Sequence, residues 1–147
     1  MKICPCGSGK TYDECCGPII AGVKVAETAE QMMRSRYTAY SEKNIPYIMK
    51  TTHPEKVSGL NESELKAWAN STTWESLRIV DTSSENIVEF IAHYREKDIV
   101  AKHHELAEFK KVDDNWYFYD SQFPKAPTFV NAAPKVCLLY TSDAADE

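Results

Sequence analysis

The chain of 147 residues lacks any long apolar run. No stretch is long enough to cross a bilayer, and no apolar segment of the secretory kind precedes the first cysteine, Cys4. We therefore expect no membrane insertion, and a location in the reducing cytoplasm, where thiols stay free. The sequence also lacks internal repeats and low-complexity segments, which excludes a repeat architecture.

A strong excess of charge is missing as well. The chain has 17 basic and 22 acidic residues, a net charge of −5. Three of the acidic residues lie in the last eleven residues, 137–147, which resemble the translated read-through of a sequencing adapter and are set aside as an artefact. The net charge then becomes −2, and Cys137 leaves the cysteine count. Such a balance excludes the basic footprint of general nucleic-acid or membrane-surface binding.

What the sequence does have is four cysteines crowded into thirteen residues near its start. They form one C-x-C pair and one adjacent pair: Cys4, Cys6, Cys15 and Cys16. Gly7 and Gly9 permit the positive φ angles of a tight reversal between the pairs, and Ser8 can bond neighbouring backbone N–H groups. Four thiolates around one ion fit Zn²⁺ best, and such a closed site leaves no position for a reactive water. We expect one structural zinc ion.

Two disulfides are the alternative for four cysteines in a short segment. Adjacent cysteines bridge poorly to a C-x-C pair, and a reducing compartment disfavours disulfides.

A zinc ion bound by four thiolates has two net negative charges. We expect Lys2, Lys10 and backbone N–H groups to offset them. Because the helices and sheet predicted between about Val25 and Phe123 make a complete core, we also expect the cysteine segment to add little buried area and the middle domain to fold without it.

About 120 residues between Pro18 and Val136 are enough for one domain with its own core. Three helix starts are predicted. A capping box at 28–31 precedes an amphipathic helix that ends near Ser41. Asn44 precedes a short helix that stops before a turn at His53, and the segment 61–64 opens a third helix.

Strand patterns follow the helices. β-branched and aromatic runs at about 74–82, 87–96, 99–112 and 116–122 are separated by short polar breaks, which favour sequential antiparallel hairpins. Helices followed by a meander indicate an α+β fold, in which a curved sheet covers the Met and Tyr face of the first long helix. The segment 124–136 contains three prolines and is typical of a linker.

The cysteine segment resembles the SEC-C zinc motif, which occurs at the C-terminus of the preprotein translocase ATPase and in many small bacterial proteins. Every position of the signature C-x-C-G-S-G-x-x-x-x-x-C-[CH] is filled between Cys4 and Cys16. The resemblance implies that the four cysteines are zinc ligands, with Lys10 and Tyr12 as supporting positions. In the translocase ATPase the motif contacts an export chaperone and the ribosome, which implies a protein or ribonucleoprotein partner here.

The rest of the chain resembles the bacterial YchJ family. The resemblance is carried by the segments 33–40 and 116–120 and by His104-Glu105 with Phe109. Members combine an N-terminal SEC-C motif with a nuclear transport factor 2-like (NTF2-like), or cystatin-like, cone domain. This implies a zinc knuckle at 1–20, a middle domain at 25–123 and a linker at 124–136. Many members have a second SEC-C motif after the linker; we attribute its absence to truncation near Val136.

The cone fold implied by the resemblance encloses a pocket between the sheet and the long helix, and the fold hosts enzymes and binding domains alike. Strand alternation and helix periodicity place six residues on faces that would line this pocket. They are Arg36, Tyr37, Tyr40, Tyr94, His103 and Glu105. Arg36 paired with Glu105 would suit proton transfer or a small polar ligand, although a satisfied core pair is the simpler interpretation.

Each histidine also has a simpler interpretation than catalysis. His103 and His104 alternate sides of one strand, so at most one faces the pocket, and a surface or hydrogen-bonded core histidine is the simpler interpretation. The middle domain shows no Asp/His dyad and no second set of metal ligands. We therefore expect a zinc-containing interaction or scaffold protein, with an enzyme or small-ligand binder that uses the cone pocket as the alternative.

Overall fold

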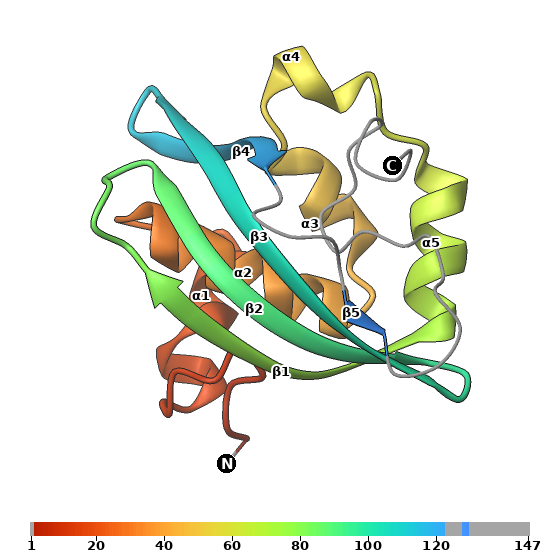
Figure 1. Ribbon diagram of the computed structural model, residues 1–147. Coiled ribbons are helices and arrows are strands. Elements are labelled where there is room, and N and C mark those ends of the chain that lie inside the picture. Colours follow the sequence, from red (N-terminus) through yellow and green to blue (C-terminus); the bar gives the residue numbers. More distant parts are fainter. Residues whose placement is uncertain (1, 123–127, 130–147) are drawn as a thin grey trace.

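The computed structural model describes residues 2–122 and 128–129, which form an N-terminal cysteine module and a cone of helices and curved sheet (Figure 1). The expected adapter-like segment, and all of the expected linker except Thr128 and Phe129, lie outside the described residues. Within the described part, no helix is both long and apolar enough to cross a membrane.

The cysteine module contains the 3-10 helix η1 (Tyr12–Glu14) and the short helix α1 (Cys16–Ile20). The longest helix, α2 (Ala29–Ser41), begins and ends where the sequence predicts. Thr28 caps it by accepting a hydrogen bond from the Gln31 N–H at 3.1 Å. In a capping box the Gln31 side chain would accept from the N–H of the cap residue itself. Here it accepts from the N–H of the preceding residue, Glu27, at 2.8 Å.

Helices α3 (Ile45–Lys50) and α5 (Glu62–Ser71) also begin as predicted, after Asn44 and Asn61. The side-chain oxygen of each asparagine accepts a backbone N–H three residues later. Between them lies a one-turn helix, α4 (Pro54–Val57), where we expected only a turn. His53 caps it: its Nδ1 accepts from the N–H of Glu55 at 3.0 Å.

The sheet is an antiparallel meander in the order β1-β2-β3-β4. Its strands are β1 (Thr72–Asp81), β2 (Ile87–Glu96), β3 (Ile99–Val112) and β4 (Asn115–Gln122), and a short β5 (Thr128–Phe129) pairs with β3. The predicted hairpin order is confirmed. Figure 1 shows the long strands curving across α2, and α2 contacts β1, β2 and β4.

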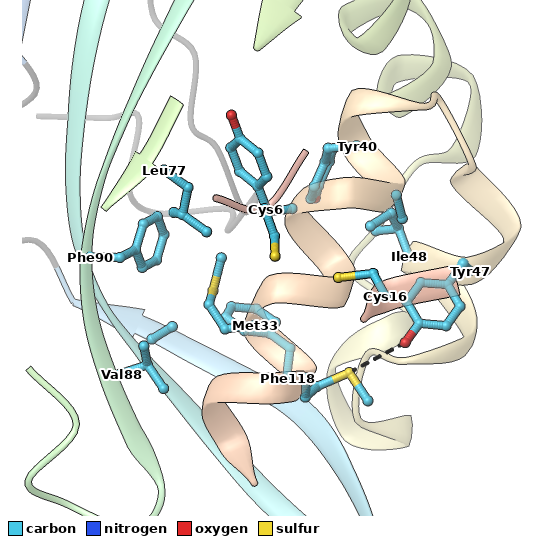
Figure 2. Packing of buried hydrophobic residues seen from close by; sticks show 14 of the residues in the cluster. Cys6, Cys16, Met33, Tyr40, Tyr47, Ile48, Leu77, Val88, Phe90 and Phe118 are labelled. Carbon is cyan, nitrogen blue, oxygen red and sulfur yellow. Dashed lines mark hydrogen bonds between the residues drawn. The ribbon is translucent and has the colours of Figure 1, made fainter. Parts of the chain in front are cut away.

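The core lies between α2 and the inner face of the sheet. Alternate residues of β2 and β3 are fully buried there, as the period of two predicts: Phe90, Ala92, Tyr94, His103, Glu105, Ala107 and Phe109. Cys4, Cys6 and Cys16 are no more than 3% exposed and belong to the same cluster as Met33 and Leu77. Figure 2 shows Cys6 and Cys16 within this cluster. The expectation that the cysteine segment adds little buried area is therefore wrong, because it packs directly on α2.

Candidate metal centre

The cysteine loop folds back on itself through its two glycines. The Cys4 N–H donates to the carbonyl of Lys10 at 2.9 Å, which closes the loop. Gly7 and Gly9 have φ angles of 81° and 89°, so the predicted left-handed conformations are present. Ser8 Oγ accepts from the Lys10 N–H at 3.2 Å, also as expected. This reversal brings the C-x-C pair to the adjacent pair at the start of α1.

The four sulfur atoms form a compact cluster. All four Sγ atoms lie within 4.8 Å of one another. The Sγ of Cys15 is 3.6 Å from that of Cys6 and 3.9 Å from that of Cys16. Sulfurs bound tetrahedrally to Zn²⁺ at ~2.3 Å are about 3.8 Å apart, so this donor set fits a zinc-sized ion. All four thiols are free, so the disulfide alternative is not the arrangement here.

The sulfurs are too close for all of them to ionise without a cation. A hydrogen bond from Cys16 lowers the pKa of the Cys6 thiol to about 4, and the same bond raises the pKa of Cys16. Burial raises the pKa of Cys15. A proton shared between Cys6 and Cys16 therefore favours one thiolate in that pair, and a metal ion is needed to hold four thiolates together.

Polar side chains at every fourth residue along one face of α2 and its C-cap contact the cysteine module; we call Arg34, Thr38 and Glu42 the α2 stripe. Arg34 Nη1 donates to the carbonyl of Cys6 at 2.8 Å and lies 3.9 Å from its Sγ. Thr38 Oγ1 is 3.7 Å from the Sγ of Cys4. These residues were not predicted from the sequence, although their spacing of four places them on one face of a helix.

Arg34, which was not expected, is thus a cation beside Cys6, and of the two expected lysines Lys2 interacts electrostatically with Cys4. Lys2 Nζ also pairs with Glu42 at 2.8 Å and lies 4.4 Å from the centre of the Tyr12 ring. Lys10 supports the loop through its backbone, and its side chain is exposed. The Tyr12 hydroxyl donates to Glu42 at 3.3 Å, which gives this position the supporting role that the motif implies.

A hollow of about 460 Å³ lies between the cysteine loop and the first turns of α2. Cys15 and Cys16 line it together with Ile19, which is half-buried. The remaining lining residues are polar and of both charge signs: Ser8, Lys10, Glu14, Lys24, Thr28, Glu30, Gln31 and Arg34.

The six expected pocket residues are all buried on the core side, but they do not form the expected constellation. Arg36 Nη1 donates to the Ile48 carbonyl, to Thr51 Oγ1 and to Thr52 Oγ1 at 3.1, 2.8 and 3.2 Å. Among the described residues no ion pair joins Arg36 to Glu105; the guanidinium hydrogen-bonds instead at the C-terminal end of α3. Burial lowers the pKa of Arg36.

Glu105 instead lies in a chain of short hydrogen bonds on the sheet. Its Oε1 is 2.7 Å from His103 Nε2, and its Oε2 accepts from the Ser121 hydroxyl at 2.6 Å. Ser121 reaches Glu105 because the pairing of β3 with β4 shifts register after Glu108. His103 is thus a hydrogen-bonded core histidine, and His104 points the other way, to Glu89 at 2.6 Å.

The three expected pocket tyrosines pack in an aromatic cluster with Trp68 and Trp74. Tyr37 and Tyr40 lie 5.8 and 6.2 Å from the Trp74 ring, measured between ring centres, and Tyr94 lies 5.1 Å from it. Such edge-on and tilted contacts are typical of core packing. The expected pocket residues therefore divide into an aromatic cluster, a carboxylate–imidazole pair and an arginine that hydrogen-bonds the end of α3. Tyr40 and Glu105 raise the pKa of this arginine against the larger effect of burial.

A cone of this kind, with a four-cysteine loop packed on its long helix, defines an NTF2-like domain that carries a SEC-C module. The family model described as "YchJ, middle NTF2-like domain" matches residues 28–121, and the SEC-C motif matches residues 2–18. The chain belongs to the YchJ family, also called UPF0225.

Relatives and solved structures agree with this assignment. A UPF0225 protein of Geobacter sulfurreducens is 50% identical over 125 residues, which cover 81% of this chain and 78% of the relative. A UPF0225 protein of Haemophilus influenzae is 45% identical over 124 residues, which cover 82% of this chain and 77% of the relative. The solution structure of a SEC-C motif containing protein from Rhodopseudomonas palustris has a TM-score of 0.77 and 38% identity, covering 85% of this chain and 100% of that one. The crystal structure of a SEC-C motif containing protein from Psychrobacter arcticus has a TM-score of 0.68 and 30% identity, covering 92% of this chain and 88% of that one. The expected family and fold are confirmed.

Proposed function

We propose that the protein binds one structural zinc ion through Cys4, Cys6, Cys15 and Cys16, and that the zinc module is a docking surface for a protein partner in the cytoplasm. The observation that carries the proposal is the convergence of four sulfurs within 4.8 Å. Four thiolates complete a tetrahedral shell, so the ion would organise the loop rather than activate water.

The hollow beside the cysteines supports the docking role. It is lined by Lys10 and Lys24 and by Glu14 and Glu30, with Ile19 as an apolar element. Such a mixture of charges is complementary to a polypeptide segment that has both acidic and basic side chains. A nucleic-acid phosphate backbone binds instead to a groove lined by basic residues. We therefore favour a protein over a ribonucleoprotein as the partner.

The rival function is an enzyme or small-ligand binder that uses the cone. It rests on the buried His103–Glu105 pair with Ser121. Both carboxylate oxygens of Glu105 are hydrogen-bonded within the core, and Arg36 hydrogen-bonds Thr51 at the end of α3, with no ion pair to Glu105 among the described residues. The internal hydrogen bonds therefore favour a packed scaffold.

A photo-crosslinking residue in place of Ile19 tests the docking role in cells. Exposed Ala67 on α5 is the matched control, because α5 lies on the opposite side of the molecule from α1 (Figure 1). We expect a defined protein adduct from position 19 that disappears when Cys15→Ser is added, and none from position 67. The same adducts from both positions, or adducts unaffected by Cys15→Ser, would contradict the proposal.

A further inference from the structure

The metal centre shares helix α2 with the cone. Residues four apart lie on one face of a helix, and the α2 stripe faces the cysteine loop while Met33 and Tyr37 of the same helix are buried in the core. One helix turn before the stripe, Glu30 accepts from Arg34 Nε at 2.9 Å. This bond fixes the guanidinium plane, so that Nη1 points to Cys6.

From this arrangement we infer that Arg34 and Thr38 are positioning residues of the metal centre. They hydrogen-bond the thiolates of Cys6 and Cys4 and thereby set metal affinity, although neither is a ligand. The inference rests on the proposed metal binding. It assigns to two helix residues a role that the cysteine motif itself does not contain.

Arg34 contributes both charge and position. Its side chain is only 19% exposed, so its positive charge lies near the sulfurs in a partly dry environment, where electrostatic attraction is stronger than in water. Through the Cys6 carbonyl it also holds the backbone of the C-x-C pair. A single side chain thus fixes the orientation of one ligand and offsets part of the negative charge of the centre.

Thr38 contributes a neutral donor. Both Thr38 and Cys4 are buried, and their side chains contact each other at 3.7 Å. Once Cys4 is a thiolate it can only accept, so the hydroxyl must donate. Ser8 stands in the same relation to Cys15, at 3.2 Å, but belongs to the loop itself. Helix α2 therefore supplies outer contacts to both cysteines of the C-x-C pair.

Zinc competition against a chromophoric chelator measures the effect. Arg34→Gln removes the charge, and Thr38→Val removes the hydroxyl at similar shape. Loss of such outer contacts weakens metal binding by about 10- to 100-fold, and we expect this of both variants. Thr38→Ser should restore affinity. Arg95→Gln is the matched control, because Arg95 pairs with Glu75 in an exposed ion pair on the sheet.

Cobalt spectroscopy separates hydrogen bonding from a general loss of structure. With Co²⁺ in the site, the thiolate-to-cobalt charge-transfer bands should move to longer wavelength in Thr38→Val and return in Thr38→Ser. Unchanged affinity and bands in both variants, or weaker binding without any movement of the bands, would overturn the inference. A wild-type protein that binds neither zinc nor cobalt would instead overturn the proposed metal binding.

Discussion

At the scale of single residues, the cysteine loop depends on backbone conformations that glycine adopts without strain. Gly7 and Gly9 both have positive φ, but their surroundings differ. A Cβ atom on Gly7 would lie 3.1 Å from the carbonyl oxygen of Leu77, whereas one on Gly9 would meet nothing within 4 Å. Gly7 is therefore also the point where the loop approaches β1 closely.

This difference predicts unequal effects of alanine. Gly9→Ala should cost about 1–2 kcal/mol of unfolding free energy, the usual penalty of left-handed backbone for a residue with a Cβ. Gly7→Ala should cost more, because the contact with β1 is added. Denaturant unfolding of both variants checks the order. Equal losses, or a larger loss for Gly9→Ala, would contradict the packing of the loop on the sheet.

At the scale of elements, α2 positions both the cysteine loop and the core, so its N-terminal cap bears on both. Thr28→Ala removes the acceptor for the Gln31 N–H and should cost about 1 kcal/mol. Thr28→Ser should retain most of the stability, and Thr82→Ala, at an exposed site after β1, should have little effect. Urea unfolding measures all three. Equal stability of Thr28→Ala and Thr82→Ala would show that the cap is dispensable.

The turn between β3 and β4 offers a stabilising change. Asp113 and Asp114 have φ angles of 51° and 69°, and Val112 pairs with Asn115 across them. Two positive φ angles in a two-residue hairpin are typical of a type I′ turn, which favours glycine at the second position.

Asp114→Gly should therefore raise the unfolding free energy by about 0.5–1 kcal/mol. Glu85→Gly, in the exposed β1–β2 connection and without positive φ, is the control and should lower it. Thermal melts of both variants decide the matter. Destabilisation by Asp114→Gly would mean that the aspartate side chain contributes more than its backbone strain costs.

The sequence predicted the elements better than their contacts. Caps at Thr28, Asn44 and Asn61 and the alternation in β2 are local patterns, and the structure contains them. Arg34 and Thr38 escaped prediction because polar residues at helical spacing usually face water, and only the docking of the loop shows what they contact. The partners of Arg36 depend on where α3 ends relative to α2, which no local pattern encodes.

At the scale of the whole molecule, the cysteine module and the cone form one core. Cys4, Cys6 and Cys16 are buried with Met33 and Leu77, although the sequence predicted a nearly independent knuckle. Removing the metal would leave closely packed thiols inside that core. Stability of the cone should therefore depend on the metal.

Chelation should lower the temperature of the main unfolding transition. A ligand at about a thousand times its dissociation constant contributes ~4 kcal/mol, which for a domain of this size corresponds to a drop of more than about 10 °C. Calorimetry with and without chelator measures the shift, and excess zinc should reverse it. A main transition that stays in place, with a separate small transition for the module, would show that the cone folds alone.

The proposed role of the whole molecule depends on four cysteines holding one zinc ion. Native mass spectrometry of the intact protein tests it most directly, because it counts bound metal and oxidised thiols in one measurement. We expect one species with the mass of the reduced chain plus one zinc, and no zinc in Cys15→Ser. Zinc retained by Cys15→Ser, or a metal-free chain lighter by the hydrogens lost in one or two disulfides, would contradict it.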